Sequence, residues 1–191
     1  MSEVAIRELR GEEMLEAMYR MDAYAFHPSP PLTDKEEWTG FVRPRQGFTY
    51  FALFEEDVPV SGAADTKMSL QVRDTLFNAG GIWGVVTGPA ARRKGYCRRV
   101  MGQLLQAVRE KGAVLSCLCP FRESFYERLG YVTYPATRIA KFKTSTLLPL
   151  VNTDLAGKIE RLLIGDGYDR YRDYLRELQT HGMALFTYGN P

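Results

Sequence analysis

The residues best suited to chemistry lie in a basic segment near the middle of the chain. From Arg92 to Arg99 the sequence reads RRKGYCRR, and it precedes a predicted helix. A helix N-terminus carries partial positive charge and N–H groups without acceptors, so clustered cations there are unfavourable alone. A bound pyrophosphate would satisfy both, and Gly95 would let the main chain approach it. The alternative is a solvated basic turn, since charge runs are usually exposed.

Two common phosphate-binding motifs do not fit this segment. A P-loop would need a second glycine five residues after Gly88, where the sequence has Arg93. The dinucleotide motif fails as well, because no G-x-G-x-x-G opens the helix. The pattern that remains is R-x-x-G-x-small, formed by Arg92, Gly95 and Cys97 between a predicted strand and a predicted helix.

The elements that must position this segment follow from apolar periodicity. Alternation of apolar and polar residues predicts an antiparallel meander with strands at Val4–Leu9, Thr49–Phe54, Val58–Val72 and Ile82–Thr87. Between the last two strands, Asn78–Gly81 is typical of a turn. Helical spacing predicts a helix over Met14–Tyr24, and Asp34 is a predicted cap for a brief helix that ends near Phe41.

The second half of the chain begins with a predicted βαβ unit. Ile82–Thr87 leads through the basic loop to a helix with Val100 and Val108 on its apolar face, and Gly112 precedes a strand at Ala113–Cys119. Further elements are expected beyond it: a helix at Glu123–Leu129, strands at Tyr131–Tyr134 and Ile139–Phe142, helical segments at Ile159–Leu163 and Tyr168–Leu178, and a strand at Met183–Tyr188. We expect an α/β (α+β) domain over residues 1–150. Residues 151–191 complete it or lead into another domain.

A second motif lies downstream, in the sequence PFRESFYERLGY that ends at Tyr131. The R-x-x-G-x-small pattern of the basic loop resembles the coenzyme A pyrophosphate loop of the GNAT acetyltransferase superfamily. The downstream segment resembles the F-Y-x-x-x-G-[FY] element of the same superfamily. The resemblance implies a central mixed sheet with helices on both faces and acetyl-CoA as cosubstrate. It also implies that Tyr126 is the general acid for the leaving thiolate. A phenol suits this role because its ordinary pKa of ~10 keeps it protonated at neutral pH. We expect Phe125 to be a core aromatic.

Within that superfamily, the chain most resembles the Eis-type bacterial acetyltransferases. The segments GGIWGVVTGPAARRKGYCRRVM and CPFRESFYERLGY carry the resemblance. It implies that main-chain groups of Val85, Val86 and Thr87 contact the pantetheine arm. The residues implied to surround the pyrophosphate and border the cofactor are Arg92, Arg93, Lys94, Gly95, Tyr96, Cys97, Arg98, Phe121 and Arg122.

The general base stays open. Eis-type proteins are usually longer and use their chain-terminal carboxylate as the base, whereas this sequence ends at Pro191. We therefore expect either a longer parent chain or another group in this role. Glu123, His27 and an ordered water are candidates.

Composition limits the remaining possibilities. The net charge of +2 does not favour nucleic acid as a partner, and the three cysteines lack metal-type spacing. No apolar stretch approaches the ~20 residues of a membrane span, so we expect a cytoplasmic protein that needs neither metal nor membrane. The expected partner is an amine substrate (aminoglycoside, polyamine or lysine), and a homo-oligomer is possible. The alternative functions are a non-catalytic acyl-CoA-binding regulatory domain and, less favoured, nucleic-acid binding.

Overall fold

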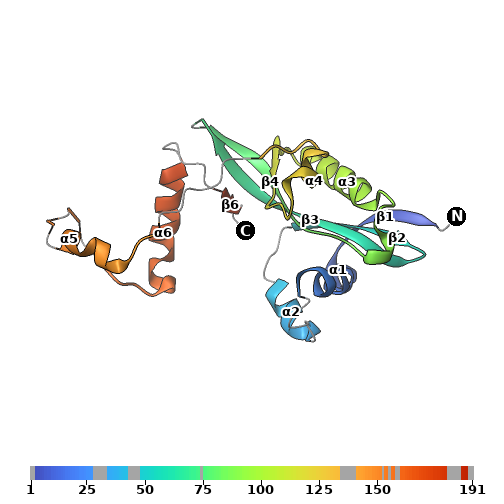
Figure 1. The fold of residues 1–191 in the computed structure, drawn as a ribbon, viewed down its shortest axis with the longest axis horizontal. Helices are drawn as coiled ribbons and strands as arrows, with labels where there is room; N and C mark the ends of the chain where they lie inside the picture. Colours follow the sequence, from blue (N-terminus) through green and yellow to red (C-terminus); the bar gives the residue numbers. More distant parts are fainter. Residues whose placement is uncertain are drawn as a thin grey trace. The chain divides into compact units, whose positions relative to one another are not determined.

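The computed structural model describes residues 3–27, 34–42, 48–73, 75–133, 141–151, 153–154, 156–157, 160–179 and 186–188. The chain divides into two compact units (Figure 1). The first comprises Met1–Arg122 and Leu178–Pro191, and the second comprises Glu123–Glu177. Each unit is described by itself below.

The first unit is built on a mixed six-stranded sheet. Its strands are β1 (Val4–Leu9), β2 (Phe48–Glu55), β3 (Val58–Val72), β4 (Thr75–Thr87), β5 (Leu115–Cys117) and β6 (Phe186–Tyr188). The order is β1-β2-β3-β4-β5, and β6 pairs with β3 at Met68–Leu70. The strands β1 to β4 form an antiparallel meander, while β5 pairs with β4 in parallel. The predicted mixed sheet and βαβ unit are confirmed.

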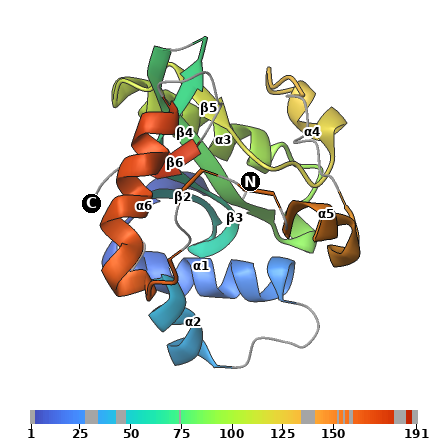
Figure 2. The ribbon, with the colours of Figure 1, turned by 90° about the vertical axis from the view of Figure 1, so that its left-hand side faces the viewer.

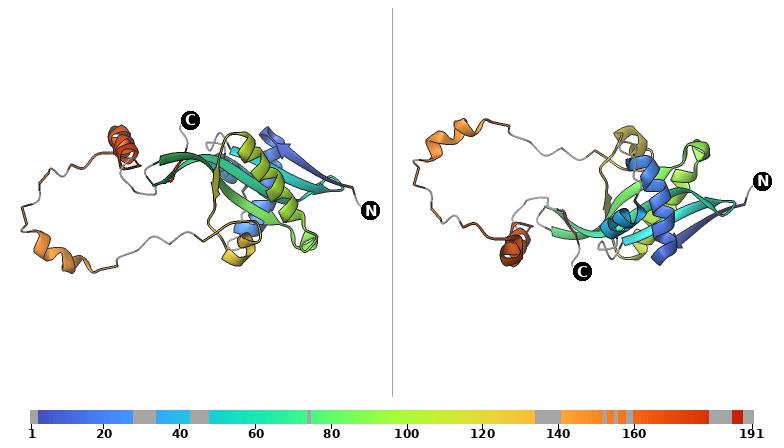
Figure 3. Two further views of the ribbon diagram at one scale, coloured as in Figure 1. Left: turned by 90° about the horizontal axis from the view of Figure 1, so that it is seen from above. Right: turned by 90° about the horizontal axis from the view of Figure 1, so that it is seen from below.

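Helices cover both faces of this sheet, as predicted. α1 (Gly11–Phe26) and α2 (Lys35–Val42) cover one face, and α3 (Tyr96–Glu110) crosses the other (Figure 3). α1 lies between the sheet and α2 (Figure 2). The predicted cap is also present, because Asp34 Oδ1 accepts hydrogen bonds from the N–H groups of Glu36 and Glu37 at 2.8 and 2.9 Å.

Each helix buries the apolar stripe that its sequence predicts. On the α1 face, Leu15 and Met18 join one core cluster with Tyr50 of β2 and Trp38 of α2. On the other face, α3 packs against β2, β3 and β4. Its buried side chains are Tyr96, Val100, Met101, Leu104 and Val108. Burial of these stripes holds both helices on the sheet, at roughly 25 cal/mol per Å² of apolar surface.

The predicted turn at Asn78–Gly81 is wrong, because β4 continues through these residues. The chain instead reverses next to Arg73, which has a positive φ of 50° at the end of β3. The glycines serve close packing. A Cβ on Gly80 would lie 2.6 Å from Asp65 Oδ1 and from Val108 Cγ1, and one on Gly81 would collide with Met68 Sδ. The two glycines are typical of a turn in the sequence, although they lie inside a strand where neighbouring side chains need the space.

The second unit consists of short helices and one long helix. They are α4 (Glu123–Glu127), the 3-10 helix η2 (Thr144–Leu147), α5 (Leu148–Val151) and α6 (Ile164–Gln179), whose last two residues belong to the first unit. The predicted helix at Tyr168–Leu178 is confirmed within α6. The predicted helix at Glu123–Leu129 ends two residues early, after which Gly130 has φ +90°.

Three elements predicted for the second unit, two strands and one helical segment, are wrong where the structure describes it. Residues 131–133 and 141–142 are not strands, and residues 134–140 lie outside the described part. The N–H of Tyr131 donates to Tyr126 O at 3.3 Å, so it closes the end of α4 instead of joining a ladder. Residues 160–163 are not helical either. Leu162 and Leu163 are 47% and 78% exposed, so little burial favours a helix there.

Candidate active site

The free end of β4 is the first part of the site. The last pair between β4 and β5 joins Gly81 to Cys117, but β4 continues to Thr87. Among the described residues, no strand pairs with Ile82–Thr87 along that edge. Val85, Val86 and Thr87 lie in this stretch, so main-chain groups are available to an extended ligand.

A β-bulge distorts the same end of β4. Between the pairs Gly62–Val86 and Ala64–Trp83, Gly84 and Val85 of β4 stand opposite the single residue Ala63 of β3. Gly84 has φ +59°, a conformation that favours glycine. The bulge leaves one residue of β4 without a cross-strand partner and changes the direction of the strand.

Polar contacts fix the end of β4 to its neighbours. Ser61 Oγ donates to Val86 O at 3.0 Å and lies 2.8 Å from Thr87 Oγ1. Arg92 Nε donates to Thr87 O at 3.3 Å, and Arg92 Nη2 donates to the hydroxyl of Tyr24 in α1 at 3.3 Å. Arg92 therefore connects three elements: the strand end, the basic loop and α1.

The main chain of the basic loop forms an anion-binding terminus. After the 3-10 turn η1 (Pro89–Ala91), Arg93 and Gly95 have φ values of +64° and +79°. Gly95 is the N-cap of α3 and has no side chain to cap it. The first bonded N–H of the helix is that of Arg99, which donates to Gly95 O at 3.2 Å. The N–H groups of residues 93–98 take part in none of the hydrogen bonds among the described residues.

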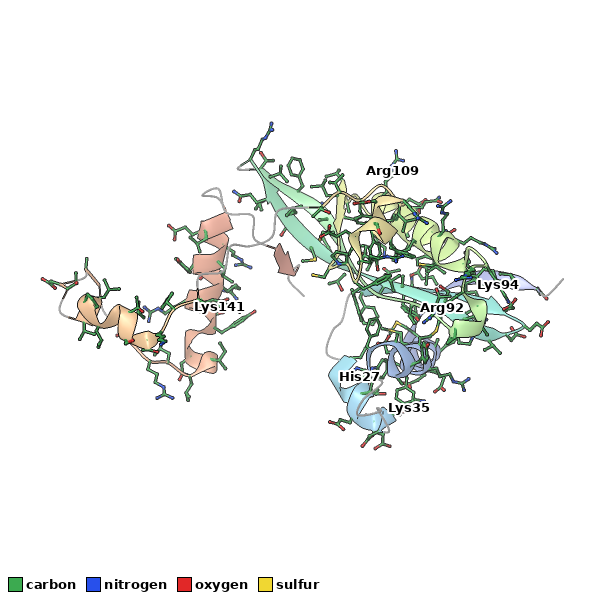
Figure 4. The ribbon with its side chains drawn as sticks, in the orientation of Figure 1. His27, Lys35, Arg92, Lys94, Arg109 and Lys141 are labelled. Carbon is green, nitrogen blue, oxygen red and sulfur yellow. The ribbon has the colours of Figure 1, made fainter. Side chains whose placement is uncertain are left out.

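One cation of the loop is already paired. Lys94 Nζ lies 2.8 and 2.9 Å from the carboxylate oxygens of Glu55 at the end of β2, and the Tyr96 hydroxyl donates to Glu55 Oε1 at 2.9 Å. The bond with Lys94, then that with Tyr96, lowers the pKa of Glu55, and Glu55 in turn raises the pKa of Lys94. The ammonium of Lys94 is therefore already paired with a carboxylate of the protein. Figure 4 shows Lys94 and Arg92 on this loop.

The other cations are exposed. Arg93, Arg98 and Arg99 form no ion pair among the described residues. Their guanidinium groups are therefore available to an anion beside the amides of residues 93–98, and arginine binds phosphate in a bidentate manner. An αL glycine, unbonded amides and unpaired guanidinium groups together fit a pyrophosphate.

The cysteines near the loop are poor nucleophiles. Burial is the main cause that raises the pKa of Cys97, and it also raises that of Cys117. A protonated thiol neither attacks an acyl group nor binds a metal. Within the described ranges, no three His, Cys, Asp or Glu residues gather as metal ligands. None of the described helices is long and apolar enough to cross a membrane.

The remaining predicted residues lie after β5. Phe121 is 74% exposed and Arg122 is exposed, both at the end of the first unit's main segment. Tyr126 belongs to the second unit, where it is buried and its ring makes edge contacts with Phe125 and Tyr131, at centroid distances of 5.0 and 6.0 Å. The structure thus brings Val85–Thr87 together with the basic loop, while Tyr126 lies in a separate unit.

The candidate bases from the sequence are exposed. His27 follows α1 on the surface, and Glu123 begins α4 in the second unit. Two polar groups of the core, Asp22 and Tyr50, were not among the predicted site residues. Asp22 had a visible signal, because it lies seven residues after Leu15 and four after Met18, on the apolar stripe of α1.

The sheet, the bulged β4 and the basic loop form one arrangement, and a family match gives its class. The acetyltransferase (GNAT) domain model matches residues 5–133, and the chain belongs to that family. None of the curated proteins has a sequence that matches this chain.

Solved structures share this fold. An acetyltransferase from Trypanosoma brucei has a TM-score of 0.57 at 20% identity, with 73% of this chain and 100% of that one covered. A GCN5-related N-acetyltransferase from Kribbella flavida has a TM-score of 0.58 at 23% identity, with 68% of this chain and 33% of that one covered. Eis1 from Mycobacterium abscessus has a TM-score of 0.51 at 17% identity, with 68% of this chain and 31% of that one covered. This chain therefore spans about a third of the length of the last two.

Proposed function

We propose that this domain is an acetyl-CoA-dependent N-acetyltransferase that transfers the acetyl group to a primary amine by direct attack. The observation that carries the proposal is the start of α3, where the amides of residues 93–98 and the side chains of Arg93 and Arg98 have no bonding partner among the described residues. When bound, acetyl-CoA supplies an activated acyl group as a thioester.

The proposed cofactor contacts divide between strand and loop. The pantetheine arm lies along Val85, Val86 and Thr87, and the pyrophosphate lies against residues 92–98, which include Arg92, Gly95, Tyr96 and Cys97. Lys94 contributes its amide instead of its ammonium, because Glu55 holds that ammonium. Phe121 and Arg122 border the cofactor. The amides of the bulged strand polarise the acyl oxygen.

Tyr126 is the proposed general acid. Its place in the F-Y-x-x-x-G-Y sequence supports this role, and a phenol carries its proton at neutral pH. The raised pKa of Cys97 favours direct transfer over an acyl-cysteine intermediate.

The proposed acceptors are aminoglycosides, polyamines and protein lysines. The resemblance of residues 80–131 to Eis-type acetyltransferases supports this class of acceptor.

We also propose bounds for the domain. Residues 1–150 form the acetyltransferase domain, and residues 151–191 complete it or lead into a further domain.

A coenzyme A release assay over an amine panel tests the cofactor site. Arg93→Glu places a carboxylate beside the phosphates, so we expect the KM for acetyl-CoA to rise about tenfold or more. Lys94→Gln is the matched control, since its ammonium is already paired with Glu55, and its KM should change less than about threefold. Equal KM values for Arg93→Glu and wild type would remove the loop from the site.

The same assay tests the acid. Tyr126→Phe keeps the ring and removes the proton, so kcat should fall about 100-fold while the KM for acetyl-CoA stays unchanged. An unchanged kcat would show that another group protonates the thiolate. A wild-type protein that releases no coenzyme A with any amine would contradict the proposed function itself.

A further inference from the structure

Asp22 is a buried acid without a partner. It lies on the buried side of α1 with 7% of its surface exposed, and its Oδ1 has no hydrogen-bond partner in the part of the chain that the structure describes. No ion pair or hydrogen bond among the described residues involves this side chain. Burying a carboxyl group without a partner is unfavourable, so a retained one indicates a ligand or a proton.

A second unpartnered oxygen lies close by on β2. Tyr50 is fully buried, and its hydroxyl has no hydrogen-bond partner in the described part of the chain. Burial, followed by the charge of Asp22, raises the pKa of Tyr50, so the two groups interact electrostatically. The hydroxyl occupies the space over Gly62, where a Cβ would collide with it. Two buried oxygens from α1 and β2 thus share one region of the core.

This region adjoins the proposed acyl site. Gly62, which lies under the Tyr50 hydroxyl, is the cross-strand partner of Val86 on β4. Tyr24, two residues after Asp22, accepts a hydrogen bond from Arg92, which also donates to Thr87 O. One strand separates the Asp22–Tyr50 region from the main chain that we propose holds the acyl group.

Among the described residues, no cation contributes to the pKa of Asp22. On α1, Arg20 pairs with Glu16, whose other oxygen pairs with Lys35 of α2. In the core cluster, β2 contributes the titratable residue Tyr50. The other elements contribute residues without charge: Ala64 from β3, Trp83 from β4, and Trp38 and Val42 from α2. Burial is therefore the cause that raises the pKa of Asp22, to about 7. A carboxyl group in this range exchanges protons at neutral pH.

We propose that Asp22 is the group that binds the acceptor's ammonium and receives its proton, with Tyr50 as a positioning residue beside it. This inference rests on the proposed function, which requires a neutral amine as the nucleophile. In the step, an N–H bond of the ammonium breaks, its electron pair stays on nitrogen, and an O–H bond forms on Asp22. The proton leaves Asp22 for solvent after the acetylated product departs. An external cation thus supplies the partner that the protein does not.

The test compares Asp22→Asn with Asp65→Asn. Asp65 is equally buried, at 5% exposure, but it lies on β3 in the same unit and is no part of the proposed site. With the best amine of the panel, we expect Asp22→Asn to lower kcat/KM for the amine about 100-fold and to remove the ascending limb of its pH profile near neutrality. The KM for acetyl-CoA should stay within about twofold, and Asp65→Asn should behave as the wild type.

A conservative variant and a readout without turnover complete the test. Asp22→Glu retains a carboxyl group, so it should keep the ascending limb at a reduced rate, even if Asp22→Asn folds poorly. Carbon-13 NMR of aspartate-labelled protein without acetyl-CoA should show two carboxyls with raised pKa values, that of Asp65 at about 6 and that of Asp22 at about 7. Asp65→Asn removes the first of these signals, which assigns the second to Asp22. Saturation with the same amine should shift the titration of Asp22 to lower pH. This signal should be missing in Asp22→Asn.

The outcomes separate the two proposals. A wild-type protein that acetylates no amine contradicts the proposed function. A wild-type protein that turns over while Asp22→Asn keeps both its rate and its pH limb contradicts the role of Asp22 alone. An amine that leaves the carboxyl titration unmoved also overturns that role, because Asp22 would then be an internal acid of the core.

Discussion

The two faces of the sheet each bury one aspartate, but in different electrostatic surroundings. Asp65 lies on β3, and its pKa is raised by burial and lowered by the nearby charge of Lys111, to about 6. Asp22 lies on the buried side of α1, where no cation of the described residues lowers its pKa, which rises to about 7. Both have one oxygen without a hydrogen-bond partner among the described residues.

The difference lies in what the covering helix supplies. Lys111 is the C-cap of α3, and its ammonium also donates to Thr49 Oγ1 of β2, so this face brings its own cation to its buried acid. α1 directs its cation Arg20 to Glu16 on the surface instead. A nearby cation offsets part of the cost of burying Asp65, whereas burial of Asp22 has no such offset among the described residues, as expected if an external ammonium binds it.

The pH dependence of stability should show the largest difference between the two buried acids. Both carboxyls have a folded pKa above their unfolded value, so their favourable contribution is complete below about pH 4 and is lost as pH rises through the folded pKa. For Asp22, the rise from 3.8 to about 7 corresponds to about 4 kcal/mol. For Asp65, the rise from 3.8 to about 6 corresponds to about 3 kcal/mol. We expect the free energy of unfolding, measured in urea from pH 4.5 to 8, to fall less in Asp22→Asn than in Asp65→Asn. A smaller fall in Asp65→Asn would show that Asp65, and not Asp22, is the costlier buried acid.

A smaller effect concerns the glycines that make room for the polar groups. A Cβ on Gly62 meets the Tyr50 hydroxyl, and one on Gly80 meets Asp65 Oδ1 and Val108. We expect Gly62→Ala and Gly80→Ala each to lower the free energy of unfolding by about 1–3 kcal/mol. Tyr50→Phe removes the colliding hydroxyl, so it should recover part of the loss for Gly62→Ala and none for Gly80→Ala. Equal recovery in both backgrounds would show that Tyr50 does not fill the space over Gly62.

The smallest effect comes from the cation itself. Lys111→Met removes the charge that lowers the pKa of Asp65, so that pKa should rise and the loss of stability should extend to higher pH. Because Lys111 is exposed, we expect a change of about 1 kcal/mol or less at pH 8. The share of the pH dependence that Asp22→Asn removes should stay the same. If Lys111→Met altered it, the two faces would be electrostatically coupled.

Local patterns were sufficient for most elements of the first unit. The strands Val4–Leu9 and Val58–Val72 begin and end where alternation predicts, because side-chain periodicity reports directly which face is buried. The basic loop could also be located, since its charges and Gly95 are contiguous. Predictions failed where a residue's role depended on a distant neighbour. Gly80 and Gly81 accommodate side chains from β3 and α3, which no local pattern reveals.

Sequence patterns alone were enough to predict the family's sheet and to place a cationic loop at the start of a helix, because both depend on residues close together in the chain. Which charges are available depends on the folded structure. There Lys94 pairs with Glu55, 39 residues away, and Asp22 lies near Tyr50 with no cation of the described residues beside it. Charge pairing and desolvation depend on distances across the fold, so only the packing of α1 and α3 on the sheet could establish them.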